Sequence, residues 1–198
     1  MALHAARLPG RRDSSGDLRS LLDQDRSRWD ARLVEEGEKL LELSASGPEL
    51  TEYHLEASIA WVHAAAPSAE ETNWGMIVEL YDRLLEIRPS PVVALNRAIA
   101  IAQRDGPERG IEEIRGIVNA DRLAGYPFYH AALGEFEFRA GRLEAAAEHF
   151  RAALALARNP MERRFLQQRF NHAAGACSPE TPPASADTPA SPPRSVER

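Results

Sequence analysis

The feature that most constrains this fold is a pattern of small and large apolar residues that recurs with the spacing of paired helices. Its clearest copy consists of Leu133, Gly134, Gly141, Ala146, Phe150 and Ala153. Small residues at such positions let two antiparallel helices approach closely, and large residues fill the space between neighbouring pairs. A chain built from such pairs typically works as a binding surface and not as a catalyst.

The sequence divides into three parts. Residues 1–29 are rich in arginine and interrupted by Pro9-Gly10, which predicts a connector with at most one short helix. Residues 30–172 carry apolar residues at helical spacing and lack the alternation of strands, which predicts an all-α domain. Residues 173–198 are rich in Pro, Ser and Ala, which predicts a disordered C-terminal tail.

Prolines, glycines and capping residues predict where the helices of the middle part begin and end. Pro91, Pro107 and Pro160 stand at favoured first-turn positions, while Pro67 and Pro89 follow expected helix ends. The expected helices span about 30–44, 51–66, 73–88, 91–105 and 107–118, then a pair around residue 141 and a last helix from residue 160. The helix from residue 107 is expected to bury Ile111, Ile114 and Val118.

Corresponding positions of the second helix in each pair recur at a nearly constant interval. Ile77, Gly110 and Ala146 are separated by 33 and 36 residues, close to the roughly 34 residues of a tetratricopeptide repeat. The register resembles that repeat and predicts a right-handed stack of antiparallel helix pairs, a solenoid. His130 and Glu137 depart from the repeat pattern, since they stand where tryptophan and tyrosine are usual. The side chains expected to be largely buried are Trp61, Trp74, Tyr81, Ile114 and Phe150.

Composition and motif searches argue against several classes of function. The formal net charge of −6 does not suit a chain that must hold nucleic acid unaided. The six histidines form no zinc motif, the single cysteine is Cys177, and no phosphate loop or nucleophile elbow is present. We therefore expect no enzyme activity, cofactor or metal. No apolar run reaches the roughly 20 residues of a membrane span, so a cytoplasmic location is expected.

Several long runs resemble one family. They are Leu22-Asp23-Gln24-Asp25-Arg26-Ser27-Arg28-Trp29-Asp30, Pro67-Ser68-Ala69-Glu70-Glu71-Thr72-Asn73-Trp74, Pro89-Ser90-Pro91-Val92-Val93-Ala94-Leu95-Asn96-Arg97-Ala98, Asp105-Gly106-Pro107 and Asn159-Pro160-Met161-Glu162-Arg163-Arg164-Phe165-Leu166. Together they resemble the C-terminal, tetratricopeptide-like region of extracytoplasmic-function (sigma-70 family) RNA polymerase sigma factors. The resemblance covers residues 1 to about 170.

This resemblance implies a non-catalytic interaction and regulatory domain in bacterial transcription initiation. In that family the polymerase-binding and promoter-binding domains precede this region, so the resemblance implies a truncated chain or a start assigned too late. The implied partners are those sigma-factor domains or RNA polymerase, and a small YCII-like protein is a further one. Specific DNA binding by this chain alone is not expected.

Two groups of residues are candidate partner contacts. Arg26, Arg28 and Trp29 lie in the connector, nearest the domains that the resemblance places upstream. Asn96 and Arg97 are the polar pair expected to face a peptide in a concave groove. That second pair belongs to an alternative reading, a free-standing adaptor that binds a peptide or protein. A gene remnant without function is the third reading.

Overall fold

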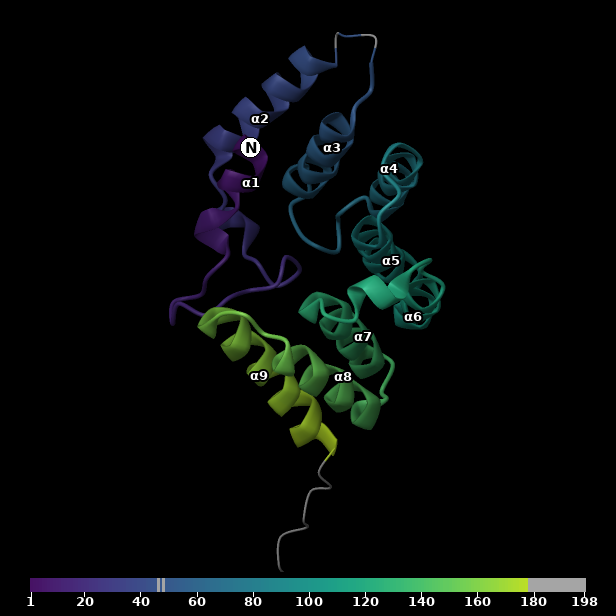
Figure 1. The fold of residues 1–198 in the computed structure, drawn as a ribbon. Helices are drawn as coiled ribbons and strands as arrows, with labels where there is room; N and C mark the ends of the chain where they lie inside the picture. Colours follow the sequence, from purple (N-terminus) through teal and green to yellow (C-terminus); the bar gives the residue numbers. More distant parts are fainter. Residues whose placement is uncertain (46, 48, 178–198) are drawn as a thin grey trace, which may run out of the picture.

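The computed structural model describes residues 1–45, 47 and 49–177, and this part of the chain is a stack of helices without a strand (Figure 1). The α-helices are α1 (Ala2–Ala6), α2 (Ala31–Ser44), α3 (Glu52–Ala65), α4 (Trp74–Ile87), α5 (Pro91–Asp105), α6 (Pro107–Arg115), α7 (Pro127–Arg139), α8 (Leu143–Ala155) and α9 (Pro160–Cys177). Short 3-10 helices are η1 (Leu8–Gly10), η2 (Arg26–Arg28) and η3 (Ala120–Leu123). The all-α prediction is confirmed.

The helices begin where capping chemistry predicts. The Asp30 side chain accepts hydrogen bonds from the backbone N–H groups of Arg32 and Leu33 at the start of α2. At the start of α9, the Asn159 side chain accepts from the N–H of Glu162 at 2.9 Å. These side chains satisfy N–H groups that have no partner within the helix. Prolines occupy the first turn of α5, α6 and α7.

Glycines allow the close helix contacts that the repeat pattern requires. A Cβ atom added at Gly134 in α7 would lie 3.0 Å from the ring of Phe150 in α8. At Gly110 in α6, the same atom would lie 2.4 Å from the Cβ of Ala102 in α5. Gly141 has a φ of 76° in the turn between α7 and α8, a conformation that side chains disfavour. The small residues of the pattern therefore set the spacing of the helix pairs.

The predicted burial is confirmed for Ile114 and Phe150, and Trp61, Trp74 and Tyr81 are partly buried against the core. Ile114 and Phe150 are 0% and 2% exposed. The three aromatic side chains of the early helices lie at the edge of their core cluster. Val118, expected inside, is 78% exposed because α6 already ends at Arg115.

The connector, residues 1–29, folds against the stack. Leu3 and Ala6 of α1 are buried, and a Cβ at Gly37 of α2 would lie 2.6 Å from the Cγ of Leu3. Trp29 is 7% exposed. Apolar burial therefore joins residues 1–29 to the helices that follow.

The connector also touches the last helix. The Asp17 carboxylate accepts a hydrogen bond of 2.9 Å from Gln168 and lies 3.7 Å from the Arg164 guanidinium. Figure 1 shows the helices following an arc from α2 round to α9, with the connector lying between its two ends. We call the contacts of Asp17 with Arg164 and Gln168 the clasp.

The C-terminal tail was predicted to begin at residue 173, but α9 extends to Cys177. Residues 173–177 continue α9, and Ala173 is 0% exposed. The helix continues because this alanine packs with Phe150 in the last core cluster. The remainder of the predicted tail, residues 178–198, lies outside the described residues.

Candidate functional site

Arg26, a predicted partner contact, serves to join the connector to α3. Its Nη1 donates hydrogen bonds of 2.8 and 2.9 Å to the backbone carbonyls of His63 and Ala66, and its Nη2 donates one of 2.9 Å to the Thr72 hydroxyl. The last carbonyls of a helix have no partner within it, so these bonds satisfy the end of α3. A partner contact of Arg26 stays a prediction, since both of its terminal nitrogens already stabilise the fold.

Trp29 and Arg28, the other connector candidates, differ in exposure. The Trp29 ring lies between two guanidinium groups, 5.5 Å from that of Arg7 and 5.2 Å from that of Arg26. Because Trp29 is buried, this side chain offers little surface to a partner. Arg28 is exposed and donates a hydrogen bond of 3.0 Å to the carbonyl of Arg12. Arg28 is therefore the connector candidate that a partner can reach.

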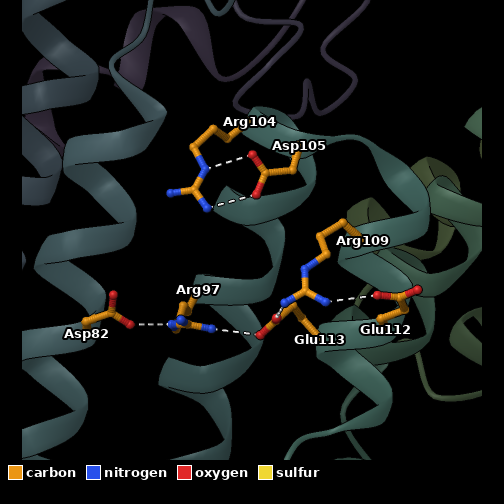
Figure 2. A network of polar contacts seen from close by, with 7 residues as sticks. All are labelled: Asp82, Arg97, Arg104, Asp105, Arg109, Glu112 and Glu113. Carbon is orange, nitrogen blue, oxygen red and sulfur yellow. Dashed lines mark hydrogen bonds and ion pairs between the residues drawn. The ribbon is translucent and has the colours of Figure 1, made fainter.

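Asn96 and Arg97, the other predicted contacts, have different surroundings. Figure 2 shows Arg97 of α5 between two carboxylates, with hydrogen bonds of 2.5 Å to Asp82 of α4 and 2.7 Å to Glu113 of α6. Glu113 also pairs with Arg109 at 2.6 Å. Asn96 is exposed and lines a different cavity from that of Arg97. Neighbouring residues of a helix point about 100° apart, and a peptide contact of this pair stays a prediction.

The cavity beside Asn96 has a volume of about 350 Å³ and is bounded by α1, α3, α4 and α5. We call it the α1–α5 basin. The polar and charged side chains that line it come from four helices and from the ends of α4 and α5: His4, Arg7, Glu56, His63, Tyr81, Arg88, Ser90 and Asn96. It thus brings together residues that are far apart in sequence.

The positive side of the α1–α5 basin has unpaired polar atoms. Among the described residues, the buried Nε of Arg7 and Nδ1 of His63 have no hydrogen-bond partner. Burial lowers the pKa of Arg7, and the nearby charges of Arg11 and Arg26 lower it further. Burial also lowers the pKa of His63 to about 4, assisted by the positive charges of Arg7 and Arg26. His63 is therefore neutral at neutral pH.

The other side of the α1–α5 basin is lined by the carboxylate of Glu56 and the phenol of Tyr81. Glu56 lies 3.6 Å from the Arg88 guanidinium, which also pairs with Glu52 at 3.2 Å. Burial raises the pKa of Tyr81 to about 12, and the charge of Glu56 adds to that effect. Tyr81 therefore keeps its hydroxyl proton at neutral pH.

Sequence reasoning did not single out Arg7 or His63 as site residues. Arg7 was one of several connector arginines, and His63 stands on an otherwise apolar stretch of α3. Their meeting depends on how α1 docks against α3, which no local spacing encodes. The one sequence feature that pointed to a positively charged site was the excess of arginine over aspartate and glutamate in the first residues of the chain.

A second cavity, of about 500 Å³, lies between α2, α3 and α4. Trp61, Val62 and Met76 contribute apolar surface, and the Trp61 indole donates a hydrogen bond of 3.1 Å to Glu38. We call it the α2–α4 groove. Within the ranges that the structure describes, no cluster of His, Cys, Asp and Glu could hold a metal ion. In the same ranges, none of the helices combines the length and apolar character needed to cross a membrane.

Comparison with known proteins finds similarity to one family model and to a longer bacterial protein. Residues 1–45 match the model of a family of unknown function, DUF6596. The chain is 34% identical over 174 residues to an uncharacterized protein of Rhizobium meliloti (strain 1021). This alignment covers 88% of the chain but 41% of the relative, so the chain spans about two fifths of that protein's length. No solved structure matches. The segment similar to DUF6596 comprises the connector and α2, which pack together in the structure.

Proposed function

We propose that this chain is a non-catalytic interaction and regulatory region of a bacterial RNA polymerase sigma factor. The proposal is supported by the sequence runs that resemble this region of extracytoplasmic-function sigma factors. It is also consistent with a relative that is more than twice as long as the matched segment, as expected if further domains accompany this region.

The observation that carries the proposal is the way in which the connector is built into the stack. Arg26 bonds to the end of α3, and Trp29 is buried beside it. In a sigma factor with this arrangement, a promoter-binding domain ahead of the connector would be held close to α1–α3. Tethering at short range gives a high effective concentration, so the interface between the two domains can be weak and still regulate promoter binding.

Binding in trans to separately expressed sigma domains tests the proposal. The polymerase- and promoter-binding domains of a family member would be titrated with this chain, with an expected affinity no tighter than about micromolar because the tether is absent. Arg28→Glu is expected to weaken binding, since Arg28 is an exposed connector cation. Arg83→Glu, on the exposed face of α4, is the matched charge reversal and should leave binding unchanged.

Two results would contradict this proposal. The first is no binding at high micromolar concentration of either component. The second is equal weakening by Arg28→Glu and Arg83→Glu, which would indicate a general charge effect and not a connector interface.

A free-standing adaptor is the second candidate, favoured by the α2–α4 groove. Met76 is 42% exposed there, beside the half-buried Trp61. Exposed apolar side chains in a concave site are typical of protein-binding surfaces. An adaptor would bind a peptide without any sigma domain, and Met76→Glu should abolish that binding while leaving the titration with sigma domains unaffected.

A further inference from the structure

We propose that the α1–α5 basin binds a small molecule through an oxyanion group, a carboxylate or a phosphate, with Arg7 as the principal anchor. This inference does not rest on the proposed function, because it follows from the charges and the cavity of the basin alone.

The first argument is a positive charge without a counter-ion. Arg7 is half-buried, and among the described residues its buried Nε has no hydrogen-bond partner. The charged groups that act on it most are the cations Arg11 and Arg26. A cation removed from water normally needs an anionic partner, and a guanidinium matches the two oxygens of a carboxylate or phosphate.

The second argument is that Glu56, the acidic residue that lines the basin, is already paired with Arg88. Glu56 lies beside Arg88 and not beside Arg7, and Arg88 is shared with Glu52. The two carboxylates therefore surround a different guanidinium, and the positive potential near Arg7 is left for a ligand. Arg26 contributes to that potential while its Nη1 binds the end of α3 and its Nη2 binds the Thr72 hydroxyl.

The third argument is the supply of neutral polar groups around the cavity. His63 is 7% exposed, lines the basin and has an unpartnered Nδ1. Tyr81 and Asn96 line the same cavity, and their hydroxyl and amide groups can donate hydrogen bonds. A volume of about 350 Å³ is at the small end of the range for small-molecule sites. A small metabolite therefore fits this cavity better than a folded partner.

Titration of the whole chain with sodium phosphate tests the proposal, with ionic strength held constant by sodium chloride. The indole N–H signals would be followed by NMR, and Trp29 assigned with Trp29→Phe. Because Trp29 contacts Arg7, its signal should shift and saturate. Trp61, whose indole donates to Glu38 in the α2–α4 groove, should not shift. Parallel titrations with acetate identify which oxyanion the basin prefers.

Variants at Arg7 decide whether the shift reports this site. Arg7→Met keeps much of the side chain's length without the charge, and it should weaken binding about tenfold or more. Arg7→Lys keeps the charge but loses the planar fork, so an intermediate affinity is expected. Arg83→Met, on the other side of α4, is the matched control and should bind as the unmodified chain does.

The proposal is overturned if neither phosphate nor acetate produces a saturable Trp29 shift up to several tens of millimolar. It is also overturned if Arg7→Met binds as tightly as the unmodified chain. If Arg7→Met does not fold, the Arg7→Lys variant decides, because an unchanged affinity there would exclude recognition by the guanidinium.

Discussion

The guanidinium of Arg26 donates a hydrogen bond of 2.8 Å to the backbone carbonyl of His63, 37 residues further along the chain. This bond joins the connector to the end of α3 and explains why residues 1–29 are part of the folded body. Arg26 is thus a structural residue whatever partner the connector meets.

Arg26→Met is expected to lower the free energy of unfolding by about 2 kcal/mol or more, because charged hydrogen bonds to buried carbonyls are lost. Urea denaturation would measure the change. Arg28→Met, at an exposed position with one bond to a backbone carbonyl, should change stability by at most about 0.5 kcal/mol. Equal effects of the two variants would refute a special role of Arg26.

Gly110→Ala should destabilise the contact between α5 and α6. The added methyl group would lie 2.4 Å from the Cβ of Ala102, and overpacking of this kind costs about 1–3 kcal/mol. Gly175→Ala is the control, since no atom lies within 4 Å of its added Cβ in α9. There the better helix propensity of alanine should leave stability unchanged or slightly higher. Thermal unfolding followed by circular dichroism distinguishes the two.

Phe150→Ala should cost about 3–5 kcal/mol, the usual loss for a buried aromatic side chain. Phe150 is 2% exposed and its ring lies against Gly134, so the neighbouring helix cannot easily fill the space. Calorimetry would measure the effect. An unchanged melting temperature would contradict the close packing of α7 against α8.

Glu137→Gln should destabilise the fold by about 1–2 kcal/mol, because the buried carboxylate loses its charged hydrogen bonds, while its two arginine partners stay in contact with water. The Glu137 side chain is 3% exposed and pairs with Arg142 and Arg115. Glu86→Gln, at an exposed position of α4, is the control. Chemical denaturation of both variants at neutral pH checks the difference, and similar stabilities would argue against a buried pair.

His63 should make the fold less stable as the pH falls from about 6.5 towards 4. Burial lowers the folded pKa of His63 to about 4 from its ordinary value of 6.5, so the unfolded chain takes up the proton first. The loss across that range is on the order of 3 kcal/mol at most. His63→Gln should flatten the slope between about pH 7 and 5, above the range where most carboxylates titrate. The control variant His172→Gln should keep the same dependence of stability on pH as the unmodified chain. If His63→Gln also keeps it, His63 is not the source of that dependence.

Local sequence signals were sufficient to place the helices of the stack. Asp30, Pro91, Pro107 and Asn159 act within one turn of the chain, so their effect on helix starts can be predicted from spacing alone. The contact of Gly134 with Phe150 could be predicted for a similar reason, since a short turn joins α7 and α8.

Contacts between distant segments could not be predicted in this way. The sequence suggested that Arg97 was available to bind a peptide. Its two acidic partners come from α4 and α6, and the sequence does not show that these helices bring them next to Arg97. The α1–α5 basin was missed because Arg7 and His63 meet only when α1 packs on the stack. Trp61 was expected to be largely buried, and the sequence did not predict that this side chain would line the α2–α4 groove.

The clasp links the connector to α9, where the two ends of the arc lie close together (Figure 1). Its contacts are partly exposed to solvent, and pairs of this kind are worth about 1 kcal/mol or less. Mild salt or a modest binding energy can therefore release these contacts. A molecule that binds between the connector and α9 would then separate the two ends of the arc without breaking a contact within any helix pair.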